Sequence, residues 1–201
     1  MYRKYLKRSL DIMLAIMLIV VFMPLIIIIY ILLFFTQGKP VLFRQMRSGK
    51  YRKPFCMYKF RSLKNIDGDS LSMEHREFTF LGKILRKTGL DELPQLIHVI
   101  KGEMSFIGPR PMPIAYEAKY SKDELKRFNV TPGITGWAQV HGKNDISWGK
   151  RFELDLWYVE HISLTLDIQI MAKTFMQFVK VIFDKNSKPK EMQVFNGSNL
   201  T

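Results

Sequence analysis

The sequence predicts an α+β protein, mainly helical, in which one long apolar helix near the N-terminus attaches a single small domain to a membrane. Three observations lead to this prediction: an uncharged apolar run, two β-like stretches just after it, and helical spacing of apolar residues further on. The residues outside the apolar run suffice for one packed domain but not for two. We therefore expect a membrane helix in residues 1–36, a folded domain in residues 37–185 and a polar tail in residues 186–201.

The apolar run covers residues 12–35, which are 24 residues without a formal charge. As a straight helix it would be about 36 Å long, and a hydrocarbon core is about 30 Å thick. Pro24 near its middle removes one helix hydrogen bond and should bend it. Lysines and arginines flank both ends, and positive charge marks the cytoplasmic side. The pattern fits either a hairpin that re-enters one leaflet or a kinked transmembrane helix.

The segments after this run predict the elements of the domain. Residues 40–43 and 55–60 have the composition of short strands, and residues 47–50 that of a turn. The polar residues 65–72 predict a surface loop. Apolar residues at helical spacing from Leu90 predict a helix that ends at Gly102. Asp91 is the expected N-cap of that helix.

Two proline-containing segments, residues 108–111 and 131–136, cannot be helical and predict stiff loops. The first would project Arg110. Beyond them, one helical face is marked by apolar residues at positions 168, 171, 175, 179 and 182. Such an amphipathic helix fits a membrane interface and a protein core equally well. The polar residues from 186 onward predict a loose tail.

The chain is strongly basic, with 31 lysines and arginines against 18 acidic residues and a formal charge of +13. Nucleic acid and anionic lipid are the partners that such charge suits. The apolar run favours anionic membrane lipid, and no stacking positions or reading helix indicate nucleic acid. Cys56 is the only cysteine, so no internal disulfide can form, which fits a cytoplasmic domain.

Several segments together resemble the bacterial sugar transferase family, the monotopic phosphoglycosyl transferases. Residues 90–96, with the sequence LDELPQL, and residues 101–111, with the sequence KGEMSFIGPRP, carry most of the resemblance. Residues 43–49, 58–62 and 132–136 also match, as do the single positions Asp155, Tyr158 and Asp167. These matches follow the family order over roughly residues 3–170.

The resemblance implies transfer of a sugar 1-phosphate from a UDP-sugar to polyprenol phosphate, in particular undecaprenyl phosphate. UMP would be released and a polyprenol-diphosphate sugar formed, a product that initiates the assembly of membrane or glycoprotein glycans. The resemblance also implies a monotopic protein of the bacterial inner membrane. Its re-entrant helix would bend at Pro24, amphipathic helices would lie in the interface, and a small catalytic domain would face the cytoplasm.

Positions that match the family pattern imply roles for individual residues. Asp91 would be the nucleophile that forms a covalent phosphosugar intermediate, and Glu92 would be a second catalytic residue that binds Mg²⁺. The phosphate-binding residues would be Lys59, Arg86, Arg110 and Lys143, and further active-site candidates would be Asp155 and Asp167. Such chemistry needs cations, because a diphosphate otherwise repels a carboxylate. A helix start at Asp91 should also favour phosphate and keep the carboxylate ionised.

The sequence departs from the family pattern at several positions. Met23 precedes Pro24, where serine is frequent, and other departures occur at His98, His141, Lys143 and His161. Direct transfer in a ternary complex by the same residues stays open. A non-enzymatic basic membrane adaptor would also explain the charge and the apolar run, but not the Asp-Glu pair among several phosphate-binding motifs.

Overall fold

The computed structural model describes residues 1–64, 78–142, 146–184 and 194–197. The α-helices are α1 (Lys7–Gln37), α2 (Phe80–Thr88), α3 (Leu96–Lys101), α4 (Trp137–Val140), α5 (Trp148–Glu160) and α6 (Leu164–Phe183). The strands are β1 (Leu42–Ser48), β2 (Pro54–Phe60), β3 (Ser105–Ile107) and β4 (Gly133–Thr135). Short helices of other types are η1 (Tyr2–Leu6), η2 (Lys50–Arg52), η3 (Leu90–Gln95), η4 (Ile114–Lys119) and η5 (Glu124–Asn129). Helices dominate and the strands are few, so the predicted α+β class is confirmed.

The strands form two separate pairs. β1 and β2 make an antiparallel hairpin in which Leu42 lies opposite Phe60 and Ser48 lies opposite Pro54. The two expected strands are therefore correct, although β1 runs further than the sequence indicated. β3 and β4 make a short parallel pair with Ser105 aligned to Gly133. The sequence did not predict β4, because Pro132 and Gly136, which flank it, and its own Gly133 resemble a turn.

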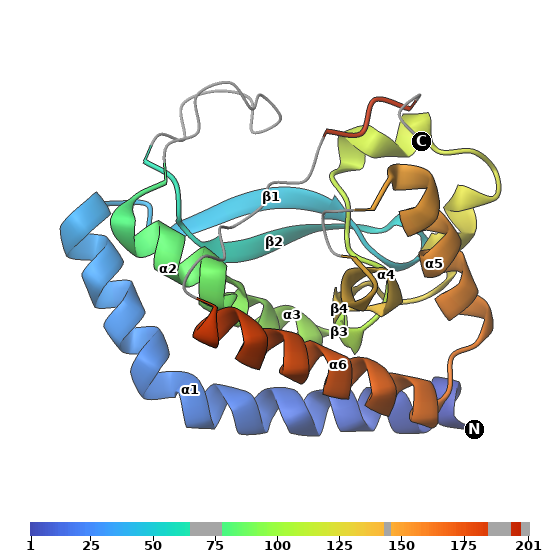
Figure 1. The fold of residues 1–201 in the computed structure, drawn as a ribbon, viewed down its shortest axis with the longest axis horizontal. Coiled ribbons are helices and arrows are strands. Elements are labelled where there is room, and N and C mark those ends of the chain that lie inside the picture. The colour runs from blue at the N-terminus through green and yellow to red at the C-terminus, as the bar shows by residue number, and fades with distance from the viewer. Residues whose placement is uncertain (65–77, 143–145, 185–193, 198–201) are drawn as a thin grey trace.

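Helix α1 contains Pro24 and changes direction about midway along its length (Figure 1). The expected bend is therefore present. The first half packs through Ala15 on a core that includes Leu96 and Met104. The second half packs through Ile29 and Leu33 on a different cluster, formed with Val41, Phe60 and Leu85. Both halves of α1 thus rest on one folded domain.

The rest of the α1 surface is apolar and exposed. Only 11% of its most apolar stretch is buried in the protein, so α1 is not a core helix. Among the described residues it is the one helix that is long and apolar enough to cross a membrane. Met13, Val20 and Val21 are examples of its large exposed side chains.

Further apolar side chains are exposed on α6 and α2. The apolar face that the sequence predicts for α6 is not in the core, because Ile168 is 59% exposed and Phe175 is 66% exposed. The core contacts of α6 come instead from Leu166 and Ile170. Phe80 at the start of α2 is 82% exposed. These apolar side chains therefore lie outside the protein core.

Within the predicted C-terminal tail, the described residues 194–197 differ from the expectation. A loose tail was predicted from residue 186, but Phe195 is fully buried in a cluster of aromatic side chains. Aromatic burial outweighs the polar character of the neighbouring residues. The expected loop at residues 65–72 lies outside the described residues.

Candidate active site

Asp91 and Glu92 lie in the first turn of η3, directly after α2. The α-helix expected to begin at Asp91 begins only at Leu96, so Asp91 is not an α-helical N-cap. Residues 90–95 form a 3₁₀ helix instead, and Pro94 lies within it. This 3₁₀ helix packs against β2 and places both carboxylates beside that strand.

Basic side chains from three other elements converge on this pair. Lys59 from β2 places its Nζ 2.5 Å from Glu92 Oε1, and Arg110 Nη2 lies 3.3 Å from the same oxygen. Arg86 in the last turn of α2 is close enough to lower the pKa of Asp91. The structure thus brings together five of the residues that the sequence singled out.

The two carboxylates have opposite pKa shifts. Burial raises the pKa of Asp91 to about 6, and the nearby cations Lys59, Arg86 and Arg110 only partly compensate. Burial also acts on Glu92, but there Lys59 and Arg110 more than compensate and lower the pKa below its usual range. The expected contribution of a helix start is absent, because the α-helix begins only at Leu96. Asp91 nevertheless stays mostly ionised at neutral pH, as expected, since its pKa of about 6 lies below that pH. Glu92, with its lowered pKa, holds the firmer negative charge.

The loop of residues 108–111, called the Arg110 loop below, is held in place by close packing of glycines. It follows β3, and β4 lies against it: the Gly108 N–H donates to Thr135 O and the Gly133 N–H donates to Pro109 O, each at 3.0 Å. A Cβ on Gly136 would lie 2.2 Å from Gly108 O, closer than any side chain can approach. The sequence predicted a stiff loop at residues 108–111. Residues 133–136 hold this loop in place, and they can approach it so closely only because the glycines carry no side chain.

Arg47 is a neighbouring cation that the sequence reasoning did not single out. Its Nη1 donates to Pro111 O at 3.1 Å, and burial together with the charge of Arg110 lowers its pKa to about 10. The signal was available, because Arg47 lies in one of the matching segments, residues 43–49. Arg47 adds positive charge beside Arg110.

Asp155 supports the site indirectly, through Arg127. Its Oδ2 forms a buried ion pair with Arg127 Nη2 at 2.7 Å, and both side chains are only 2% exposed. The same Arg127 nitrogen donates to Arg110 O at 2.9 Å. Asp155 therefore holds the Arg110 loop through Arg127. It forms no contact with Asp91 among those described.

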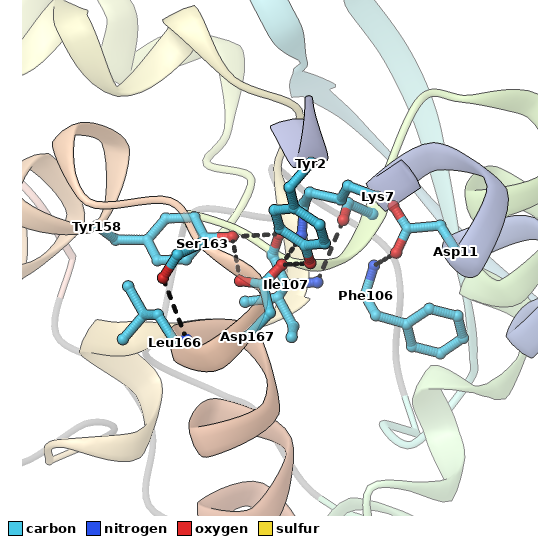
Figure 2. Close-up of polar contacts among 10 residues, drawn as sticks. Tyr2, Lys7, Asp11, Phe106, Ile107, Tyr158, Ser163, Leu166 and Asp167 are labelled. Atoms are coloured by element: carbon cyan, nitrogen blue, oxygen red, sulfur yellow. Dashed lines mark hydrogen bonds and ion pairs between the residues drawn. The ribbon is translucent and has the colours of Figure 1, made fainter. Parts of the chain in front are cut away.

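Asp167 belongs to a different cluster, at the N-terminal end of the chain. Figure 2 shows the Asp167 carboxylate accepting hydrogen bonds from Tyr2 Oη, Lys7 Nζ and Tyr158 Oη, with the Lys7 contact at 2.6 Å and the Tyr158 contact at 2.8 Å. Nearby, Asp11 Oδ1 accepts from the Phe106 N–H at 3.1 Å. These contacts join α1 to α5, α6 and β3. Lys143, the last candidate, lies outside the described residues.

Comparison with known proteins agrees with this picture. The bacterial sugar transferase family model matches residues 2–181. The uncharacterized sugar transferase EpsL of Bacillus subtilis is 43% identical over 84% of this chain and 85% of its own length. The UDP-glucose:undecaprenyl-phosphate glucose-1-phosphate transferase of Escherichia coli is 38% identical over 88% of this chain. The UDP-N-acetylgalactosamine-undecaprenyl-phosphate N-acetylgalactosaminephosphotransferase of Aeromonas hydrophila is 37% identical over 85% of it.

The relatives differ in length. The match covers 41% of the Escherichia coli protein and 43% of the Aeromonas protein, so those proteins contain a further region that this chain does not match. The segments that hold Asp91, Glu92, Lys59 and Arg110 all fall inside the matched part. This chain belongs to the bacterial sugar transferase family.

Proposed function

We propose that the protein transfers a sugar 1-phosphate from a UDP-sugar to undecaprenyl phosphate, with release of UMP. The observation that carries the proposal is the buried Asp91 carboxylate beside Glu92, with Lys59, Arg86 and Arg110 around it. A buried carboxylate among cations suits a reaction in which a negatively charged diphosphate must approach a negatively charged nucleophile. The names of the relatives from Escherichia coli and Aeromonas describe reactions of this class with different sugars.

In the first step, an Asp91 oxygen attacks the phosphorus that carries the sugar. The bond from this phosphorus to the oxygen bridging the two phosphates breaks, and UMP leaves with the electron pair. In the second step, an oxygen of undecaprenyl phosphate attacks the same phosphorus and breaks its bond to Asp91. The carboxylate is regenerated and the diphosphate-linked sugar is formed. Two steps allow a water-soluble donor and a lipid acceptor to use one pocket in turn.

The basic side chains have separate tasks in this scheme. Arg110 presents a planar guanidinium that can bind two phosphate oxygens together. Lys59 is an ammonium group whose pKa burial lowers, and Glu92 holds it beside Asp91. Positive charge brought close to Asp91 lowers its pKa and thereby favours the ionised nucleophile.

The two carboxylates also fit a Mg²⁺ ion. No group of three potential protein ligands occurs among the described residues. Mg²⁺ does not require one, because it commonly binds through one or two carboxylates and completes its shell with substrate phosphates and water. Glu92, which stays ionised, would hold the ion and Asp91 lies beside it. When bound, the ion would neutralise charge on the diphosphate.

The arrangement of α1 supports a monotopic position in the membrane, with the domain on the cytoplasmic face of the inner membrane. Near the start of α1, Arg8 Nη2 donates to Ile100 O at 2.7 Å. At its end, Gln37 Nε2 donates to Thr79 Oγ1 at 2.8 Å. A helix tied to the same domain at both ends, and bent between them, suits a hairpin in one leaflet better than a crossing. The exposed apolar faces of α2 and α6 would lie in the interface.

The test is release of UMP from a panel of UDP-sugars, with undecaprenyl phosphate and Mg²⁺ present. We expect one donor to be preferred, and Asp91→Asn to abolish turnover. Donor without acceptor should leave a phosphosugar on Asp91, visible by mass spectrometry. Strict dependence of UMP release on the acceptor, with no adduct, would favour direct transfer in a ternary complex. Normal turnover by Asp91→Asn would remove Asp91 from its role.

A further inference from the structure

The C-terminal segment, residues 194–197, docks on the domain through Phe195. This segment lies beyond residue 181, the last one that the family model matches. The Phe195 N–H donates to Tyr116 Oη at 3.2 Å, and Lys119 Nζ donates to Phe195 O at 3.0 Å. The ring packs at centroid distances of 5.1–5.7 Å against Tyr116, Tyr120, Trp148 and Phe152. The ring is fully buried and the main chain of Phe195 forms two hydrogen bonds, so this segment is specifically anchored to the domain.

The aromatic cluster that receives Phe195 also holds Arg127. The Arg127 guanidinium lies over the rings of Tyr120 and Phe152, 5.7 and 5.6 Å from their centroids. Both rings are in direct contact with Phe195. Stacking fixes the plane of a guanidinium and hence the directions of its N–H groups. The orientation of Arg127 therefore depends on how the rings around Phe195 pack.

Arg127 in turn reaches the active site. Its Nη2 donates to the main-chain oxygen of Arg110, whose own side chain contacts Glu92. Met112, two residues after Arg110, is fully buried in the same aromatic cluster. The Arg110 loop is thus bounded by glycines on one side and by the aromatic cluster on the other. A continuous series of contacts runs from the C-terminal segment to the candidate catalytic carboxylates.

We propose that the C-terminal segment positions the active site: Phe195 keeps the aromatic cluster packed, the cluster orients Arg127, and Arg127 holds the Arg110 loop. The inference rests on the proposed function, because it assigns the donor's diphosphate to Arg110. Phe195 touches no reacting atom and is a positioning residue. Without its ring, a cavity opens where Tyr120 and Phe152 meet, and these rings can rotate away from Arg127.

A double-mutant cycle tests this coupling. We expect Phe195→Ala to lower kcat/KM for the UDP-sugar about tenfold or more, mainly through KM, because small displacements of a binding group have large effects. Phe195→Leu, which refills most of the cavity, should restore most of the loss. In an Arg110→Ala background, Phe195→Ala should have little further effect. If Phe195→Ala lowers kcat/KM by the same factor in both backgrounds, Phe195 does not act through Arg110.

Two truncations provide the matched control. A chain that ends at residue 193 lacks Phe195 and should behave like Phe195→Ala, whereas a chain that ends at residue 197 should behave like the full chain. Hydrogen exchange gives a readout that does not depend on turnover. The shorter chain should exchange faster over residues 108–130, with α1 and β2 unchanged. Faster exchange throughout the domain, or no change over residues 108–130, would overturn the inference.

The exchange experiment also separates this inference from the proposed function. If the unaltered chain releases no UMP from any donor, the proposed function fails. Local loosening of residues 108–130 in the shorter chain would then still establish the structural coupling of the C-terminal segment to the Arg110 loop. If UMP is released normally and residues 108–130 do not loosen, only the inference fails.

Discussion

At the scale of single residues, some of the buried charges occur as ion pairs. The clearest is the pair between Arg127 and Asp155, in which both side chains are almost inaccessible to solvent. Burial raises the pKa of Asp155 despite the adjacent guanidinium, which shows that desolvation is costly here. A buried pair of this kind adds little net stability compared with apolar side chains, but the loss of one partner leaves an uncompensated charge.

We therefore expect Asp155→Leu to destabilise the protein strongly. Leaving Arg127 buried without its partner should lower the free energy of unfolding by about 3–5 kcal/mol. Urea denaturation of the detergent-solubilised protein measures this. The matched control is Asp123→Leu, which removes an exposed pair with Lys126 and should leave the denaturation midpoint unchanged. Equal midpoints for both variants would show that the Arg127 pair is not a structural requirement.

His98 shows how a departure from the family pattern is accommodated. Its Nε2 accepts the Tyr58 N–H at 3.1 Å, and its Nδ1 lies 2.6 Å from Glu103 Oε2. An accepting Nε2 requires the neutral ring with its proton on Nδ1, which then donates to Glu103. The sequence identifies His98 as a departure from the family pattern. It does not reveal the hydrogen-bond partners, because Tyr58 lies 40 positions and Glu103 lies 5 positions from His98 along the chain.

At the scale of elements, the cluster around Asp167 ties the start of α1 to the domain. Asp167 is in the first turn of α6, and its three hydrogen-bond donors come from η1, α1 and α5. The sequence marked Asp167 as an active-site candidate because it lies in a matching position. Its contacts give it a structural task that spacing along the chain could not indicate, since Lys7 is 160 positions away.

Asp167→Asn should loosen the N-terminal end of α1. A hydrogen bond to a charged group contributes about 1.5–3 kcal/mol, so losing the Lys7 contact should raise local opening about tenfold or more. Limited trypsin digestion followed by mass spectrometry should show faster cleavage after Arg3 and Lys7. Glu153→Gln, which alters only an exposed pair with Lys150, is the control. Equal cleavage rates would contradict a clamping role for Asp167.

How well the sequence predicts the structure differs from element to element. The α6 helix and the β1–β2 hairpin were predictable, because their apolar spacing and turn residues are local signals. The α-helix from Asp91 was misplaced, since residues 90–95 form a 3₁₀ helix and the α-helix begins only at Leu96. The Asp-Glu pair and its cations could be named from the family resemblance. Arg127 and Phe195 could not, because their roles depend on contacts between distant segments, whereas Arg47 lies in a matching segment, residues 43–49, and could have been named.

At the scale of the whole molecule, the path of α1 is the main question. A straight helix of 31 residues would be about 46 Å long, well beyond a hydrocarbon core of about 30 Å. In the monotopic arrangement proposed above, the bend at its middle and the contacts at both ends would accommodate this excess without a crossing. The domain, the charged N-terminal residues and the segment after Gln37 would then share one side of the membrane.

Cysteine labelling tests the position of both ends. Arg3→Cys and Lys39→Cys, each in a Cys56→Ser background, should react with an impermeant reagent only from the side that also labels Lys122→Cys in the domain. In Pro24→Ala the restored helix hydrogen bond should straighten α1 and place the two ends on opposite sides. Opposite labelling of Arg3→Cys and Lys39→Cys without the Pro24 change would refute the monotopic arrangement.

The net charge of the molecule predicts how it responds to lipid composition. A chain with a net charge of +13 that is held at the membrane surface should favour anionic lipid, with each basic residue near the surface contributing about 1 kcal/mol. Reconstituted into liposomes, the protein should have a lower KM for undecaprenyl phosphate when anionic lipid is added to zwitterionic lipid. High salt should remove this difference, because it screens charges beyond a few ångströms. An equal KM in both liposomes at low salt would show that the basic charge serves the bound substrates alone, and that α1 and the apolar faces of α2 and α6 suffice to hold the domain at the membrane.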